Sequence, residues 1–301
     1  MKKKIILSII FIIICITVVL IIILINNKKE SSDKFTYTPP MYKICDSDSC
    51  IYILGSIHTG DERVTKFNSV IIDAYNNSDS LAVELDIQDI NLDINEFILE
   101  NGTIDDYISE EFSEKLIKFS NNHSLFPIET LKYMKLGYLY DYISLLPYIE
   151  NGYNNEGVDS YFITLAKKDN KQIISLETYE KQLNMLIGSS NELYIKHLEY
   201  IIDNYDEVTK ISLDLYNAYL EGDEKKLTKL IEEDKEEYET DEEKEYIKAL
   251  YDDRNIEMSK KVEEFLTNNN KVFMTVGTAH VIGHNGIIEL LKDKYKISKV
   301  K

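Results

Sequence analysis

Two stretches of this sequence share one pattern and decide the fold that we expect. Residues 50–58 read CIYILGSIH, and residues 272–280 read VFMTVGTAH. Each begins with an apolar run as long as a buried strand and ends in Gly-x-x-His. Because glycine permits a tight turn between a strand and a helix, each stretch predicts a strand, a turn and a helix. His58 and His280 are expected beyond the carboxyl ends of the two strands.

Two further predicted strands end near a carboxylate. Leu81–Leu85 contains Glu84, and Gln172–Leu176 is followed directly by Glu177. An apolar strand does not ordinarily accept a glutamate unless its charge is paired or bound. Ligands of open α/β sheets bind outside the carboxyl ends of the strands. We therefore expect two imidazoles and two carboxylates at one edge of a sheet.

Neutral imidazoles and a carboxylate form a common ligand set for a divalent cation such as Mn, Co or Zn. Such a cation can lower the pKa of water and provide a nucleophile at neutral pH. The alternative is that each histidine is a loop residue hydrogen-bonded to the backbone, because a single Gly-x-x-His is a weak signal. Two copies in matched settings, 222 positions apart, favour a shared site, but spacing alone leaves both interpretations open.

The other three histidines are expected outside this set. His284 is either a third ligand, four residues after His280, or a residue at the start of a helix. His123 and His197 lie in polar segments and are predicted at the surface. The sequence contains no His-Glu-x-x-His pattern, no Gly-x-Ser-x-Gly and no phosphate-binding glycine loop, which argues against the commonest metalloproteases, esterases and nucleotide-binding proteins.

The composition limits the class of protein. Among 301 residues, 34 are Lys or Arg and 53 are Asp or Glu, which gives a net charge of −19. So acidic a chain lacks the basic surface that nucleic-acid binding requires. Hydrophobic residues make up 44% and charged residues 29%, as in ordinary globular proteins. With only 4 prolines and 11 glycines, long segments can be helical.

The patterns together predict an α/β (α+β) fold, in which many helices flank a central mixed β-sheet of about four to six strands. The four strands above are joined by a closing strand at Tyr295–Val300. Apolar periodicity predicts the following helical segments: a helix soon after Gly60, with Val64, Phe67, Ile71 and Ala74 on one face; a helical insertion at about 90–153; a helix at Gly157–Lys168; a long helical stretch from Thr178 to Asn268; and a helix at Gly283–Leu291.

The N-terminus predicts a membrane anchor. Three lysines precede Ile5–Ile25, which contains no charged residue and, at roughly 1.5 Å per residue, is long enough to cross a bilayer. The lysines favour a cytoplasmic N-terminus. We therefore expect a single-pass anchor at 1–26, a polar linker at 27–40, and a domain at 41–301 outside the cytoplasm.

Cys45 and Cys50 flank a four-residue polar turn between two short apolar runs, a pattern typical of a hairpin. In an oxidising exterior the two residues could form a disulfide, and two free thiols are the alternative.

The motifs resemble those of the TraB/GumN family, which includes the TIKI proteases and the PrgY pheromone-shutdown proteins. The resemblance runs from about Tyr42 to the C-terminus and rests on these elements, in order: LGSIH ending at His58, AVEL around Glu84, Gly157-Val-Asp159, Leu-Glu177-Thr-x-x-x-Gln182-Leu, Tyr-Leu-Glu-Gly222-Asp223, Asp-Arg254-Asn255, TVGTAH ending at His280, and Gly-x-x-Gly286.

The resemblance implies a fold similar to erythromycin-esterase-like and ChaN-like proteins, and a metal-dependent hydrolytic site. It implies His58, His280 and Glu84 as metal ligands, with Glu84 alternatively the catalytic base. It also implies Arg254 as a catalytic group that stabilises a developing oxyanion, and Glu177 as its helper. The expected activity is hydrolysis of a peptide or protein substrate. Sequestration of a peptide pheromone without turnover and hydrolysis of an ester are the alternatives.

Overall fold

The structure is a computed structural model that describes residues 38–90, 93–123, 125–236 and 240–300. The predicted anchor and nearly all of the predicted linker lie outside the described residues. Within the described part of the chain, no helix is long and apolar enough to span a membrane.

A six-stranded mixed sheet forms the centre of the protein, in the order β6-β4-β7-β2-β1-β8. The first four strands of that order are mutually parallel, whereas β1 is antiparallel to both of its neighbours. This confirms the predicted α/β fold with a mixed sheet. The bounds of the strands, including a separate two-stranded ladder of β3 and β5, are β1 Met41–Cys45, β2 Cys50–Ser56, β3 Thr59–Gly60, β4 Ser80–Val83, β5 Asn155–Glu156, β6 Gln172–Ser175, β7 Val272–Gly277 and β8 Lys296–Lys299.

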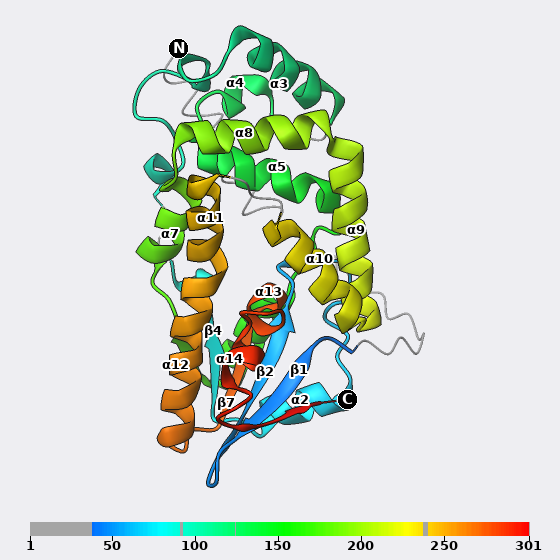
Figure 1. Cartoon of the computed structure of the whole chain (residues 1–301), viewed down its shortest axis with the longest axis vertical. Helices are drawn as coiled ribbons and strands as arrows, with labels where there is room; N and C mark the ends of the chain where they lie inside the picture. Colours follow the sequence, from blue (N-terminus) through cyan, green and yellow to red (C-terminus); the bar gives the residue numbers. More distant parts are fainter. Residues whose placement is uncertain (1–37, 91–92, 124, 237–239, 301) are drawn as a thin grey trace.

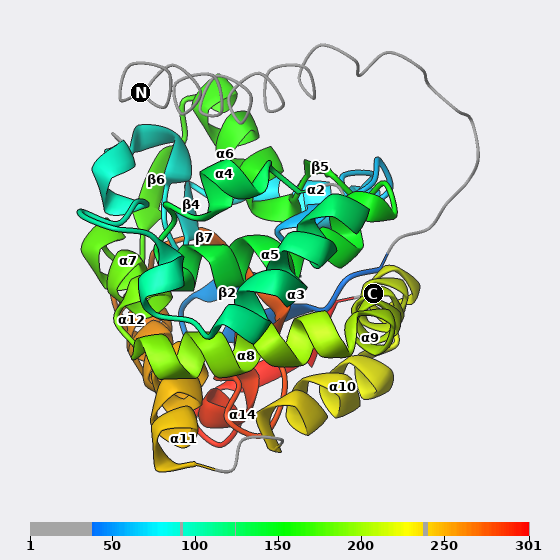
Figure 2. The ribbon, with the colours of Figure 1, turned by 90° about the horizontal axis from the view of Figure 1, so that it is seen from above.

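Helices cover both faces of the sheet, which explains why its inner strands are continuous apolar runs. All four residues of β4 are buried, and so are the first five of β7. Figure 2 shows the sheet between two helical layers, with α2 and α6 on one side and α12 and α14 on the other. The helices of these two layers, with the short helix that follows β7, are α2 Ser69–Asn76, α6 Val158–Asp169, α12 Asp253–Thr267, α13 Thr278–Val281 and α14 Ile287–Leu291.

Most of the remaining helices build a cap beyond the carboxyl ends of the parallel strands (Figure 1), whereas buried residues between 216 and 231 pack into the core of the sheet. The cap has its own hydrophobic core, made from residues 104–146 together with residues 194–201. The predicted insertion and the first part of the later helical stretch therefore pack into one unit. The elements are η1 Ile87–Asp89, η2 Ile94–Glu96, η3 Ile104–Asp106, α3 Glu110–Asn122, α4 Ile128–Leu131, α5 Leu136–Glu150, α7 Tyr179–Ile187, α8 Asn191–Asp203, α9 Tyr205–Glu221, α10 Glu224–Glu236, α11 Asp241–Ile247 and the π-helical turn η4 Lys248–Asp252.

Two predicted helices are wrong in their extent. The helix expected soon after Gly60 begins only at Ser69, where the side chain of Asn68 accepts a hydrogen bond from the Ile71 N–H and caps it. The helix expected from Gly283 begins at Ile287, because Gly283 has a φ of 98°, which is outside the helical region.

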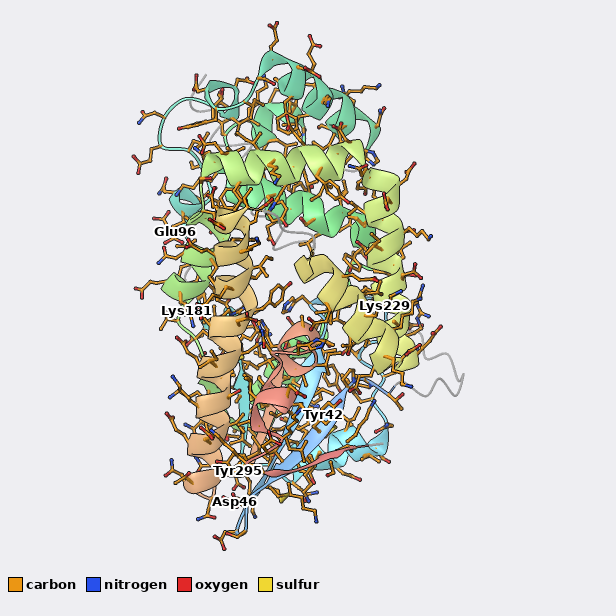
Figure 3. The ribbon with its side chains drawn as sticks, viewed as in Figure 1. Tyr42, Asp46, Glu96, Lys181, Lys229 and Tyr295 are labelled. Carbon is orange, nitrogen blue, oxygen red and sulfur yellow. A yellow bond between two sulfur atoms is a disulfide. The ribbon has the colours of Figure 1, made fainter. Side chains whose placement is uncertain are left out.

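The predicted hairpin is present, and it carries a disulfide. Cys45 and Cys50 face each other in the β1–β2 register and are bonded. The turn is held by the carboxylate of Asp46, which accepts hydrogen bonds from the N–H groups of Asp48 and Ser49. Figure 3 shows Asp46 at the end of the molecule opposite the cap. The disulfide is therefore remote from the carboxyl ends of the strands.

Candidate functional site

Three strands bring the predicted residues to one edge of the sheet, beneath the cap. Ser56 at the end of β2 pairs with Gly277 at the end of β7, and Val83 of β4 pairs with Thr275 on the other side of β7. The groups that follow these strand ends must therefore lie close together, as the sequence predicted for His58, Glu84 and His280.

Glu84 sits between β7 and a buried arginine. Its Oε1 accepts a hydrogen bond from the Gly277 N–H at 2.7 Å, and its Oε2 accepts one from Nη2 of Arg254. Burial by itself would raise the pKa of this carboxyl. The neighbouring His280, the Arg254 guanidinium and the Gly277 N–H outweigh burial and lower that pKa to about 2. Glu84 is therefore an ionised carboxylate at neutral pH.

His280 is buried as a neutral imidazole. Burial lowers its pKa to about 4, although Glu84 opposes the change. Its Nδ1 lies 2.7 Å from Oδ1 of Asn255, and the amide of Asn255 is itself oriented by donating to the Asn285 carbonyl at 2.8 Å. Because the amide oxygen only accepts, we assign the proton to Nδ1. Nε2 then carries no proton, and it lies 3.9 Å from Oε1 of Glu84.

His58 has a different environment. Its Nδ1 donates to Oδ2 of Asp159 at 3.1 Å, and the other oxygen of Asp159 accepts from the Thr275 hydroxyl at 3.1 Å. The hydrogen bond with Asp159 raises the pKa of His58 to about 9, against the opposing effect of desolvation. The side chain is 70% exposed, so solvent and solutes can reach it.

Gly277 leaves a space among these three groups. A Cβ at this position would lie 3.3 Å from Oε1 of Glu84, 3.5 Å from Cδ2 of His280 and 3.9 Å from Nε2 of His58. The missing side chain is therefore what keeps the region between the carboxylate and the two imidazoles open. Any residue other than glycine would fill it.

The donors around this space have the right chemistry for a divalent cation. Each histidine uses Nδ1 for an orienting hydrogen bond and keeps Nε2 for another partner, as metal-binding histidines commonly do. As the described side chains stand, however, no group of three or more His, Cys, Asp or Glu residues forms a metal site. Binding would require the side chains to close in and His58 to lose its proton.

Arg254 joins the two predicted carboxylates. Its Nη2 donates to both Glu84 and Glu177, and its Nε donates to both oxygens of Glu177 at 2.9 and 3.0 Å. The Arg254 side chain is 6% exposed and that of Glu177 is 2% exposed. The ion pairs offset the burial of these charges, and removing Arg254 would leave the buried Glu84 carboxylate without its cationic partner.

A backbone carbonyl and two side chains of α7 make further contacts with Arg254 and Glu177. Nη1 of Arg254 donates to the Leu250 carbonyl at 3.3 Å, within the π-helical turn η4 that precedes α12. Such turns are frequent at functional sites. Gln182 and Lys181 of α7 contact the Glu177 carboxylate at 3.3 and 3.1 Å. Glu177 is thus surrounded by partners and holds Arg254 in place beside Glu84.

The other histidines lie outside this cluster. His284 has an 84% exposed side chain and pairs with Glu232, so the structure does not bring it to His280. The prediction that His197 lies at the surface is wrong, because its side chain is 11% exposed and packs against Tyr140 of the cap. His123 is 23% exposed, and it packs against Phe119 while its Nδ1 pairs with Glu150.

Several residues of the cluster escaped the sequence analysis. Asp159, Asn255 and Gln182 were noted only as parts of motifs, and Thr275 was read only as a strand residue. The one available signal was a polar residue beside a motif glycine or arginine, as in Gly157-Val-Asp159 and Asp-Arg254-Asn255. That signal does not say which group each side chain contacts.

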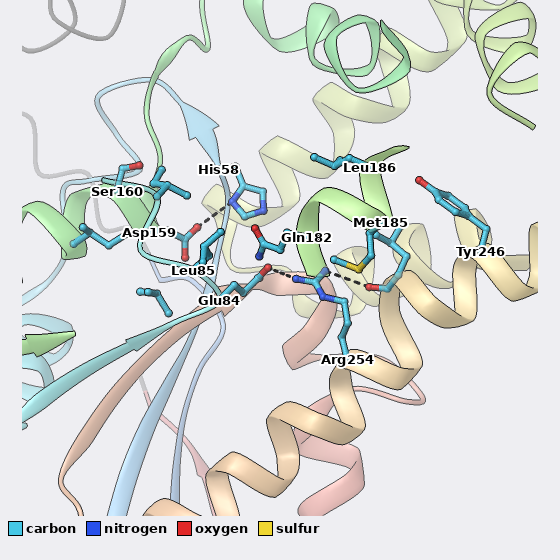
Figure 4. Close-up of a pocket in the computed structure, with 14 residues that line it drawn as sticks. His58, Glu84, Leu85, Asp159, Ser160, Gln182, Met185, Leu186, Tyr246 and Arg254 are labelled. Atoms are coloured by element: carbon cyan, nitrogen blue, oxygen red, sulfur yellow. Dashed lines mark hydrogen bonds and ion pairs between the residues drawn. The ribbon is translucent and has the colours of Figure 1, made fainter. Parts of the chain in front are cut away.

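A cavity of about 350 Å³ opens beside the cluster (Figure 4). His58, Glu84, Asp159 and Arg254 line one part of it, and apolar residues from the loop after β4, α7 and η4 line much of the rest. Charged groups of the cluster are thus accessible from a pocket large enough for part of a substrate.

The comparisons with known proteins identify the family of this chain. No curated protein and no solved structure matches the chain. Residues 40–299 match the model of the TraB/PrgY/gumN family, and this chain therefore belongs to that family.

Proposed function

We propose that this protein is a metal-dependent hydrolase that cleaves peptide bonds. The observation that carries the proposal is the space above Gly277, around which two imidazoles and an ionised carboxylate are gathered. His58, His280 and Glu84 would hold the cation, with Mn, Co and Zn as the candidates. Sequestration of a peptide without turnover is the competing function, and hydrolysis of an ester is a third.

A bound divalent cation would supply Lewis-acid chemistry and make water a nucleophile at neutral pH. The residues of the chain have separate tasks around it. His280 offers Nε2 in a fixed tautomer, because Asn255 occupies Nδ1. Glu84 serves as a ligand or accepts a proton from the attacking water, for which its ionised state is required. Arg254 lines the cavity beside Glu84, where its charge can stabilise a developing oxyanion.

We also propose that the domain is anchored in the cell membrane by residues 1–26 and lies outside the cytoplasm. The uninterrupted apolar run after three lysines supports the anchor. The Cys45–Cys50 disulfide supports the location, because disulfides persist in oxidising compartments. Protease added to intact cells should digest the domain, whereas digestion only after lysis would place it in the cytoplasm.

The metal site can be tested by thermal unfolding of the full-length chain with and without Mn, Co or Zn. A cation that binds only the folded state stabilises it by about 2.7 kcal/mol at a hundredfold excess over the dissociation constant. The upward shift in melting temperature should shrink in His58→Ala, His280→Ala and Glu84→Gln. His284→Ala is the matched control, because its exposed imidazole lies outside the cluster.

The outcomes separate the candidate functions. Shifts of equal size in all four variants would show that this cluster does not bind the cation. A shift that depends on the cluster, together with products from a peptide library, supports the hydrolase. Peptide binding without any product, in the presence of each cation, favours sequestration.

A further inference from the structure

A group of apolar side chains lines the cavity without belonging to either hydrophobic core. The five side chains in question line the cavity beside Glu84 and Arg254 and are absent from both core clusters: Leu85, Ile87, Met185, Leu186 and Leu250. All are partly or largely exposed, and Ile87 is 53% exposed. Apolar side chains gathered in a pocket without serving the core are characteristic of a binding site.

The position of these side chains relative to the cluster is specific. In Figure 4, Met185 and Leu186 of α7 lie on the far side of Gln182 from His58, and Tyr246 of α11 lies beyond them. A ligand that occupied this part of the cavity would have Arg254 and Glu84 at one end and an apolar wall along its length. The ring of Tyr246 closes that wall.

A second, larger and more polar cavity of about 720 Å³ adjoins the first. The two share Met185, Tyr246 and Leu250, so these residues form the boundary between them. The second cavity is lined by polar groups of α7 and α11 such as Asn184, and Ser189 lies in the loop after α7. An extended chain can therefore place one side chain in the apolar cavity and its polar backbone along the second. A small molecule would fill only one of them.

We propose that the apolar cavity is a specificity subsite that receives an aliphatic or aromatic side chain of a peptide substrate, next to the bond that reacts. The proposal rests on the proposed function, since it assumes a peptide at the Glu84–Arg254 edge. Met185 contributes to the selectivity together with Tyr246 and Leu250, because these three residues separate the apolar cavity from the polar one. A charged side chain at this position of the substrate would lose its hydration without gaining a partner.

The test uses the full-length chain in lipid nanodiscs and a positional-scanning library of decapeptides. Bound, uncleaved peptides and cleaved products are quantified separately by mass spectrometry. The wild type should enrich Leu, Met or Phe over Asp and Lys at one position by about tenfold or more. Met185→Glu should abolish this enrichment and raise that of Lys, because it places a carboxylate in the wall of the cavity.

Two further variants control the result. Ile211→Glu makes the same kind of change at a 41% exposed residue of α9 that does not line the cavity, and it should keep the wild-type profile. Met185→Ala enlarges the cavity without adding charge, and should shift the preference from Leu toward Phe and Tyr. This variant keeps the test decisive if Met185→Glu fails to fold.

A wild-type profile without any apolar preference overturns the subsite, and so does a profile that neither Met185 variant changes. The bound peptides can also show an apolar preference that depends on Met185 while no product forms with any of the cations. That result would support the subsite and count against hydrolysis. Cleavage products that show no apolar preference would support hydrolysis and count against the subsite.

Discussion

The two Gly-x-x-His elements are nearly interchangeable as sequence and very different as structure. His280 is 6% exposed on its side chain, and burial lowers its pKa to about 4. His58 is 70% exposed, and Asp159 raises its pKa to about 9. One imidazole is held neutral by the core of the protein, and the other is held charged by a carboxylate at the edge of a cavity.

This difference shows that the Gly-x-x-His motif determines where the imidazole lies but not whether it is protonated. Gly-x-x-His places an imidazole just beyond a strand, but the surroundings of the ring set its protonation, burial for His280 and the Asp159 carboxylate for His58. An amide at Asn255 keeps Nε2 of His280 free of a proton, whereas the Asp159 carboxylate favours a proton on both nitrogens of His58. In the protein without a bound metal, only the imidazole of His280 has a lone pair available at neutral pH.

The largest effect on stability is expected from the ion pairs that Arg254 forms with Glu84 and Glu177, beside His280. Arg254→Met leaves Glu84 and Glu177 without their shared cation and should reduce the free energy of unfolding by about 3–5 kcal/mol. Urea-induced unfolding measures the change. Lys248→Met removes an exposed partner of Asp253 nearby and should leave stability unaltered. Equal stability of Arg254→Met and wild type would mean that the three charges are not coupled.

An intermediate effect is expected from the residue that orients His280. Asn255→Ala removes the acceptor for the Nδ1 proton in a buried place and should destabilise the protein by about 1–3 kcal/mol. At the metal site that we propose, the loss should also weaken binding of the cation by about 10–100-fold. Nitrogen NMR of the imidazole should show one tautomer in the wild type and a mixture in the variant. Asn255→Asp keeps an acceptor but adds a carboxylate, so, as Asp159 does for His58, it should raise the pKa of His280 and favour a proton on both nitrogens.

The smallest effect is expected at His58, because its side chain is largely exposed. Its folded-state pKa is raised, so its contribution to stability is present below about pH 6.5 and is lost as the pH rises toward about 9. Asp159→Asn should bring the pKa down toward the ordinary value and flatten that dependence. NMR titration of chelator-treated protein checks both. An unchanged His58 pKa in the variant would show that Asp159 does not set it.

The sequence supported accurate expectations wherever the signal was local. The inner parallel strands are largely apolar runs because helices cover both of their faces, and the hairpin is recognisable from its polar turn between two cysteines. Helix starts were less accurate. Asn68 as a cap and Gly283 with a positive φ delay two helices, and in each case the apolar periodicity alone pointed to an earlier start.

The sequence by itself determined that His58, Glu84, Glu177 and His280 lie at or just after the ends of strands, because the pattern of apolar residues decides about where a buried strand ends. Only the tertiary structure decided the rest. It placed β7 between β2 and β4, which brings His58, Glu84 and His280 together around Gly277. It also chose the partners of each group, because protonation and charge depend on neighbours that are distant along the chain. Asp159 is 101 positions from His58, and Arg254 is 170 positions from Glu84.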